Sequence, residues 1–203
     1  MKQQNKTSIN KWLGLVFAGS MMMSGHAYAQ FDRASMLADS CVGCHGVDGI
    51  SSGPAIPSIA GMSEYYFKES MKAYRSGERP STIMQRIAKG YTDEDIEAMA
   101  GYFANLEYVP VEQEHNDKVA KIGAKLHDRF CSKCHEDAGT LPGDDSGFLS
   151  GQMKPYLHYS MDDFTSGHRD MERKMKRALD KLDKAYGDDG ITALIEYYAS
   201  GEK

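Results

Sequence analysis

Several common features are missing from this chain of 203 residues. No cysteine lies outside two short motifs, so none is spare for a disulfide. No segment alternates apolar and polar residues as a β-strand does, and the glycine-rich pattern GxGxxG of dinucleotide-binding folds is absent. Beyond the N-terminus, no apolar run reaches the roughly 18 residues that a membrane span needs. Together these absences favour an all-α chain.

All four cysteines belong to two copies of Cys-x-x-Cys-His, CVGCH and CSKCH, which stand ninety residues apart. In this motif two thiols form thioethers with the vinyl groups of a porphyrin, and the adjacent histidine ligates the iron. We therefore predict two covalently bound haem c groups. The predicted attachment and proximal-ligand residues are Cys41, Cys44 and His45 in the first motif and Cys131, Cys134 and His135 in the second.

Two other readings of the cysteines are weaker. A Cys₄ zinc site does not require a histidine after each pair, and ninety residues is a long gap between its halves. Thioredoxin-like redox pairs follow a β-strand rich in Val and Ile, and neither motif has that context.

The ninety-residue offset continues downstream of the cysteines, which indicates duplication of a whole domain. The matching residues include Gly61 and Gly151, Tyr66 and Tyr156, Ser70-Met71 and Ser160-Met161, and Arg79 and Arg169. Later the offset becomes ninety-five, as Ile96 answers Ile191, so the second copy carries a net insertion of five residues. We predict a signal peptide at 1–29, an N-terminal domain at 30–107, a linker at 108–116 and a C-terminal domain at 117–203.

The first 29 residues have the pattern of a secretory signal. Three lysines precede an apolar stretch, and Ala27-Tyr28-Ala29 supplies an A-x-A cleavage site. Glycines interrupt the stretch, which disfavours a retained anchor, so we expect a periplasmic protein without a membrane span after signal removal. The formal charge of −5 includes the three signal lysines, which leaves −8 on the mature part and makes it a poor nucleic-acid binder.

Helical spacing recurs through both halves. The first is expected to form helices from about Asp32 into the first haem motif, from Ser63 to Arg75 and from Thr92, where Thr92 to Asp95 resembles a capping box. In the second half the expected helices are Lys118–Phe130, Lys154–Phe164, Glu172–Tyr186 and Ile191–Ser200.

The sixth iron ligand decides the chemistry, since a methionine gives a closed site of raised potential suited to electron transfer. Met84, just ahead of the last helix of its domain, is our prediction for the first haem. Met171 runs into a similar sequence, MER against MQR, and is our prediction for the second, with Met175 as the alternative. Met71 and Met161 sit in register inside predicted helices, where packing is the commoner role of a methionine.

Histidine is the rival sixth ligand, but none of the candidates recurs in both halves. They are His115, His127, His158 and His168. We interpret His127 as a surface or interlobe residue. Tyr65, Tyr66, Tyr156 and Tyr159 are expected to wall the haem pockets, and the Gly53-Pro54 loop and Pro142-Gly143 are the candidates to hold the proximal histidines through a backbone carbonyl.

Three segments, STIMQRIAKGY, GAKLHDRFCSKCH and MERKM, resemble the cytochrome subunit of flavocytochrome c sulfide dehydrogenase, a dihaem class I cytochrome c. The resemblance covers essentially the whole mature chain. It implies two class I cytochrome c-like domains and a separate FAD-containing flavoprotein partner that oxidises sulfide and passes electrons to the haems. A soluble cytochrome or similar acceptor would follow. The family carries methionines at the positions matching Met84 and Met171.

Two other functional classes stay open. A free dihaem carrier would shuttle electrons to a terminal oxidase or reductase, and a peroxidase-like enzyme would need one open haem. The recurring methionines argue against the enzyme.

Overall fold

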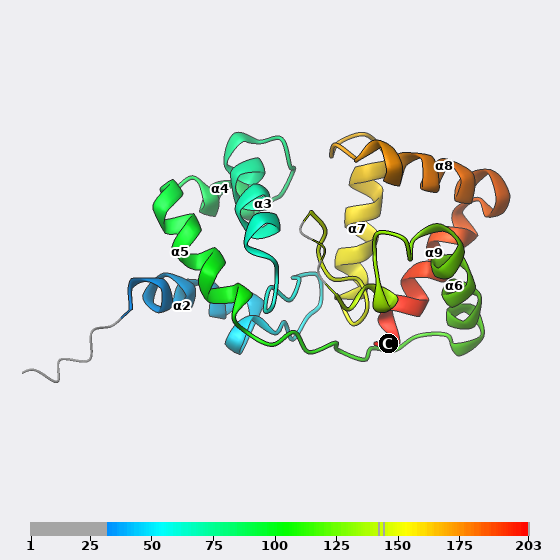
Figure 1. Cartoon of the computed structure of the whole chain (residues 1–203), viewed down its shortest axis with the longest axis horizontal. Coiled ribbons are helices and arrows are strands. Elements are labelled where there is room, and N and C mark those ends of the chain that lie inside the picture. Colours follow the sequence, from blue (N-terminus) through cyan, green and yellow to red (C-terminus); the bar gives the residue numbers. More distant parts are fainter. Residues whose placement is uncertain (1–31, 142, 144, 203) are drawn as a thin grey trace, which may run out of the picture. The chain divides into compact units, whose positions relative to one another are not determined.

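The computed structural model describes residues 32–141, 143 and 145–202, and the predicted signal peptide lies outside the described residues. Every regular element of this described part is helical, as predicted, and residues 32–203 form one compact unit. Its first lobe contains α2 (Arg33–His45), α3 (Glu64–Ser76), α4 (Met84–Ala88) and α5 (Asp93–Ala104). Its second lobe contains α6 (Asp117–Phe130), α7 (Lys154–Thr165), α8 (Arg173–Tyr186) and α9 (Asp188–Ala199) (Figure 1). None of the described helices is long and apolar enough to cross a membrane.

Each lobe has its own hydrophobic core, built on the contact between its first and last helices. In the first lobe α5 packs on α2 and α3, with Ile96, Met99 and Phe103 at most 2% exposed. In the second, α9 packs on α6, α7 and α8 around Leu126 and Ile195. The last helix is therefore the element that fixes the first, which ends in the haem motif.

One aromatic residue of the second half belongs to the core of the first. Phe148 is 4% exposed, lies in the first-lobe core and stacks on Tyr108 with ring centroids 3.6 Å apart. The segment around Tyr108 thus packs against both halves of the chain instead of crossing solvent as a free linker.

Side-chain caps fix the starts of three helices, and one of these caps was predicted from the sequence. The predicted capping box is present: the Thr92 hydroxyl accepts from the Asp95 N–H, and the Asp95 carboxylate accepts from the Thr92 N–H. Ser63 caps α3 through the Tyr66 N–H, and Asn116 caps α6. These contacts explain why the predicted and observed starts agree within about two residues.

The duplication extends to backbone geometry. Gly49 and Gly139 both have positive φ, and their carbonyls accept hydrogen bonds from Ile59 and Leu149, each at 2.8 Å. A second matched bond ties the loop of each lobe to its last helix. It joins the Gly61 N–H to the Phe103 carbonyl at 2.8 Å and the Gly151 N–H to the Tyr198 carbonyl at 2.7 Å. Phe103 and Tyr198 therefore occupy the same place in the two lobes.

The net insertion predicted in the second half corresponds to a longer helix. α8 has 14 residues, whereas its counterpart α4 has five. α4 was not predicted from the sequence, because five residues show too little periodicity to be recognised as a helix.

The close approach of α6 and α9 depends on a glycine. A Cβ at Gly123 would lie 1.9 Å from the Ala193 carbonyl oxygen and 2.7 Å from the Tyr197 Cβ. We predict that Gly123→Ala destabilises the protein by about 1–3 kcal/mol, because backbone would have to move. The measurement is the free energy of unfolding in denaturant.

The control is Gly101→Ala on α5, where a Cβ meets nothing within 4 Å. Alanine is the better helix former, so this variant should gain about 0.5–1 kcal/mol. Equal unfolding free energies for the two variants would contradict the packing described here.

Candidate haem sites

The haem motifs sit where the first helix of each lobe ends. The first lies in the last turns of α2, and the second begins directly after α6. In both motifs the first cysteine is partly buried against the lobe core and the second is exposed. Burial raises the pKa of the Cys41 thiol, and it raises that of Cys131 to about 11. Both pairs are free thiols at the edge of an apolar core, as thioether attachment requires.

His45 is held in the orientation that an iron ligand needs. The side chain is 9% exposed, and its Nδ1 lies 2.8 Å from the Pro57 carbonyl oxygen. A backbone carbonyl at Nδ1 fixes the tautomer in which Nε2 carries the lone pair. Burial lowers the pKa of His45, which favours this neutral form. The residue that holds the ring is Pro57, so the expectation that the Gly53-Pro54 loop does so was wrong by a few residues.

The second proximal histidine is less completely described. His135 is partly buried, and burial lowers its pKa, with a further contribution from His127. Pro142, one of the residues considered for holding its ring, lies outside the described residues.

A zinc site is not supported. Within the described part of the chain, no three His, Cys, Asp or Glu side chains come close enough together to hold a metal ion.

Met84 packs against the core of the first lobe and stays the predicted sixth ligand of its haem. Met84 is the first residue of α4, is partly buried, and packs against the same core as Cys41. Its N–H donates to the Ser81 hydroxyl at 3.0 Å, which fixes the start of the helix. Met71 is 6% exposed inside that core, consistent with the packing role predicted for it.

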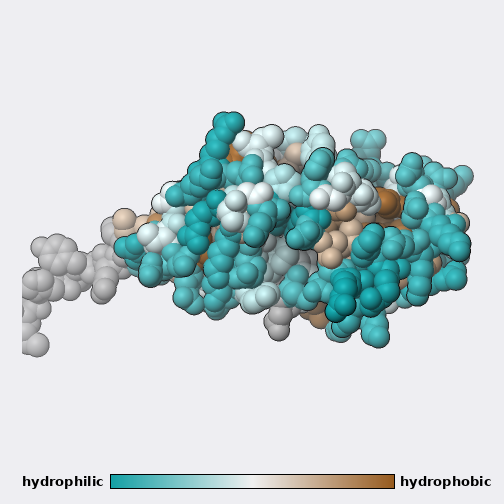
Figure 2. Space-filling view, turned by 90° about the horizontal axis from the view of Figure 1, so that it is seen from above, coloured by the Kyte–Doolittle hydropathy of each residue, from teal (hydrophilic) through white to brown (hydrophobic). Residues whose placement is uncertain are grey.

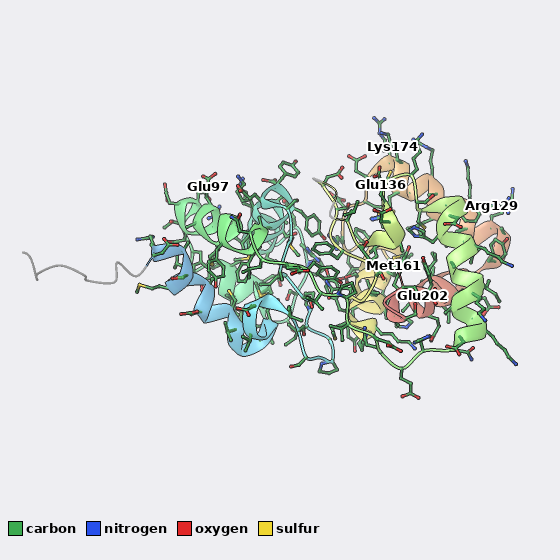
Figure 3. All side chains as sticks on the ribbon, turned by 60° about the horizontal axis from the view of Figure 1, so that its bottom comes forward. Glu97, Arg129, Glu136, Met161, Lys174 and Glu202 are labelled. Carbon is green, nitrogen blue, oxygen red and sulfur yellow. The ribbon has the colours of Figure 1, made fainter. Side chains whose placement is uncertain are left out.

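The structure does not bring Met171 to the second core. Met171 is partly buried two residues before α8, and Met175 is partly buried on α8. Met161 on α7, labelled in Figure 3, packs against the second core together with Cys131, consistent with the packing role predicted for it. Met171 therefore stays a prediction, and the choice of sixth ligand in this lobe is one for experiment.

Two of the histidines considered as rival ligands contact other residues through their ring nitrogens, His115 through both and His168 through one. His115 Nδ1 lies 2.8 Å from the Gln113 carbonyl oxygen, and its Nε2 lies 3.1 Å from an Asp117 carboxylate oxygen. His168 is exposed, with Nδ1 3.0 Å from the Ser166 hydroxyl.

The expectation that His127 is a surface or interlobe residue was wrong. It lies on α6, is 1% exposed, and has the rings of Tyr197 and Tyr198 of α9 beside it, each with its centroid 5.7 Å from the imidazole.

The tyrosines expected in the pocket walls differ in exposure. Tyr65 and Tyr159 are 56% and 63% exposed. Tyr66 and Tyr156 lie between the lobes.

A reciprocal pair of contacts joins the lobes. Arg79 Nη2 donates to the Tyr156 hydroxyl at 3.0 Å, and Arg169 Nη2 donates to the Tyr66 hydroxyl at 3.1 Å. All four residues are matches of the ninety-residue repeat, so each lobe supplies one arginine and one tyrosine. The sequence showed the repeat of these residues, but it gave no sign that they meet across the lobes.

The arginines give an independent test of whether haem fits. Arg79 is 7% exposed, and its other partners are neutral: the Ser70 hydroxyl at 3.0 Å and the Tyr74 ring at 4.7 Å. Among the described residues no carboxylate forms an ion pair with it. Burying a cation without an anion costs free energy. We therefore expect a negatively charged group that does not belong to the chain to lie beside Arg79.

The positive charges of Arg79 and Arg169 affect the pKa of the nearby Tyr66 hydroxyl. Burial acts to raise the pKa of Tyr66, but Arg79 and Arg169 outweigh it and lower the pKa to about 8. Haem brings carboxylates of its own in its two propionates. The positive charge between the lobes, the free thiols and the oriented imidazole all fit that cofactor.

Comparison with known proteins identifies the family to which the chain belongs. The cytochrome c family profile matches residues 32–107. The "Thiosulfate dehydrogenase electron acceptor" of Stutzerimonas stutzeri is 30% identical over 184 residues, which cover 84% of this chain and 83% of that protein. The chain belongs to the dihaem cytochromes c.

Other dihaem and haem proteins share parts of this similarity. The crystal structure of cytochrome c4 from Pseudomonas stutzeri superposes with a TM-score of 0.69 and 26% identity, covering 87% of this chain and 99% of that one. The "Cytochrome subunit of sulfide dehydrogenase" of Chlorobaculum tepidum is 50% identical over 74 residues, which cover 36% of this chain and 66% of that subunit. This dihaem cytochrome thus has two class I cytochrome c-like domains and two covalently bound haem c groups.

Substitution can test the predicted methionine ligands of this cytochrome. We predict that Met84→Ala opens one haem, because a closed low-spin site loses its sulfur ligand. Half of the low-spin absorption should convert to high-spin, whereas Met71→Ala should leave the spectrum unchanged. Met171→Ala should convert the other half, and Met175→Ala should not. A low-spin spectrum in both Met84→Ala and Met171→Ala would contradict the assignment.

Proposed function

We propose that this cytochrome is the electron-accepting subunit of a sulfide-oxidising dehydrogenase and works in the periplasm. It would receive electrons from an FAD-containing flavoprotein and pass them to a soluble cytochrome or similar acceptor. The observation that carries the proposal is the 50% identity over 74 residues to the cytochrome subunit of sulfide dehydrogenase. This identity is higher than the 30% and 26% of the two matches that extend over most of the chain.

The chain's own residues have separable roles in this function. His45 and His135 would hold the irons from one side, and Met84 and Met171 from the other. Bound haem supplies a one-electron couple in each lobe. Closed coordination on both sides suits electron transfer, because the iron changes charge with little rearrangement of its ligands.

The surroundings of the proposed ligands differ between the lobes. In the first, Val47 follows His45 by two residues and is 71% exposed, and Ile83 precedes Met84 and is 54% exposed. Asp137 stands ninety residues after Val47, and Asp170 precedes Met171 as Ile83 precedes Met84; both aspartates are exposed. Exposed apolar side chains favour a lasting contact, and charged ones favour a brief contact that salt weakens.

The rest of the surface is largely hydrophilic. Figure 2 shows charged and polar residues over most of one face, with smaller apolar areas between them. In the second lobe Arg129 and Lys174 lie at the periphery (Figure 3), and α8 carries exposed basic residues along its length. We therefore assign the first lobe to the dehydrogenase and the second to the soluble acceptor.

A second candidate function is a free carrier, such as the acceptor of a thiosulfate dehydrogenase. The similarity to the Stutzerimonas stutzeri protein of that name extends over 84% of this chain, whereas the sulfide dehydrogenase match covers 36%. The two functions differ in whether a flavoprotein stays bound and in which sulfur compound reduces the haems.

The decisive experiment is purification of the tagged chain from the periplasm of its own host. We expect a flavin-containing protein to co-purify, and the complex to reduce its haems with sulfide far faster than the separated cytochrome does. A haem-only protein that a thiosulfate-oxidising enzyme reduces, and that sulfide does not, would overturn the proposal.

A substitution tests the assignment of the first lobe in the same complex. Val47→Asp copies the residue of the second lobe and should weaken the flavoprotein contact by about 1–2 kcal/mol, roughly 5- to 30-fold in dissociation constant. The matched control is Val109→Asp, at another exposed valine, which is 44% exposed. It should leave the dissociation constant unchanged.

A further inference from the structure

The two lobes differ at one matched pair of core positions. Four residues before the first cysteine of the motif stands Leu37 in the first lobe and His127 in the second. The residue of the last helix that ties down the loop is Phe103 in the first lobe and Tyr198 in the second. An apolar pair has therefore become a polar, titratable pair at the same place in a duplicated fold.

The polar pair is hydrogen-bonded and buried. His127 Nδ1 lies 3.0 Å from the Tyr198 hydroxyl, and the side chains are 1% and 5% exposed. His127 Nε2 is buried and has no hydrogen-bond partner among the described residues. Tyr198 also hydrogen-bonds Cys131, the first cysteine of the motif, which lowers the pKa of that thiol against the larger effect of burial. The pair thus connects an unpartnered nitrogen to the sulfur through which the second haem is held.

The groups around His127 are few. Burial lowers the pKa of His127 below its usual value, and the neighbouring Asp128 on α6 acts in the opposite direction with a smaller effect. α9 presents Tyr197, whose ring centroid is 5.7 Å from the imidazole, besides Tyr198. The haem motif contributes His135, whose pKa His127 lowers.

The other helix that contacts α6 is α8. It presents Leu182 to the second core, and the ring of its Tyr186 packs edge-on against Phe130 at 6.3 Å. Neither contact places a charge against the imidazole.

We infer that the pair His127–Tyr198 makes the two haems unequal, favouring reduction in the second lobe and coupling that reduction to uptake of a proton by His127. The inference rests on the proposed role of the chain as a dihaem electron carrier, but not on the identity of its partner.

Two physical effects point the same way. A hydroxyl that donates toward the attachment sulfur stabilises the more electron-rich state of the site. When one electron arrives from an external donor, the positive charge near His127 falls by one, and its pKa rises. His127 then takes one proton from water at Nε2, the nitrogen without a partner, so up to one proton accompanies one electron. In the first lobe Leu37 and Phe103 can do neither.

The sign of the pH dependence follows from the folded protein. In the oxidised protein His127 is neutral above its lowered pKa, and after reduction it is neutral only above a higher pKa, so the proton accompanies the electron at pH values between the two. As the pH falls through the pKa of His127, the potential of the second haem should rise more than that of the first. The first haem, measured in the same sample, removes the contribution common to both sites, such as propionate titration.

The test is a redox titration of the isolated dihaem protein at several pH values, with the two haems assigned by NMR of their methyl groups. The variant His127→Leu with Tyr198→Phe gives the second lobe the residues of the first. We expect the potential of its second haem to fall, the extra pH dependence to disappear, and the first haem to stay unchanged. The NMR shift of the His127 ring in the parent protein should report protonation at higher pH after reduction.

Tyr198→Phe alone keeps the aromatic ring and should also lower the potential of the second haem. This variant tests the inference if the double variant does not fold. The matched control is Tyr197→Phe, which removes a neighbouring hydroxyl and should change neither potential. Unchanged potentials and pH slopes in Tyr198→Phe and in the double variant, with the protein folded, would overturn the inference. Because no dehydrogenase is present, that result would leave the proposed function standing.

Discussion

The contact between the first and last helix of each lobe is the constraint on which the rest of this cytochrome depends. The first helix ends in the haem motif, so whatever fixes that helix also fixes the cysteines and the imidazole beside the core. In the second lobe α6 and α9 approach so closely that Gly123 has no room for a methyl group. In the first lobe α5 has a capped start and contributes the buried side chains of Ile96, Met99 and Phe103 to the core. The loop between them is tied to the last helix by the same backbone bond in both lobes.

The two lobes meet through charge that the chain does not balance. Each sends an arginine to the tyrosine of the other, and Arg79 is buried with neutral partners. A covalently attached cofactor with acidic groups resolves this cost, which joins the attachment chemistry to the assembly of the lobes. The lobes are similar in plan and different in surroundings: the first exposes apolar residues near its proposed ligands, and the second exposes charged ones. Such a division suits a protein that holds one partner and releases another.

Much of this was predictable from the sequence. The cysteine motifs, the ninety-residue repeat and the helical spacing carried the all-α fold and the two haems, because each is local in sequence. The capping box at Thr92 was found for the same reason. The failures concern contacts that local pattern does not encode. Nothing around His127 indicates that its helix turns that side chain toward α9, and the carbonyl that holds His45 comes from a loop residue twelve positions away. Met84 was predicted from its position before a helix and packs against the first core, whereas Met171 is not among the residues that pack against the second core, so spacing alone does not settle that ligand.

The central claim is that two porphyrins are held by thioether bonds, one in each lobe. Its most direct test is the intact mass of the exported protein after denaturation and acid–acetone extraction, with peptide mapping of the two motifs. The account predicts a mass increase of two haems that survives extraction, one on the peptide of each Cys-x-x-Cys-His motif. A protein that keeps unmodified thiols, or loses its haem absorption on extraction, would contradict it.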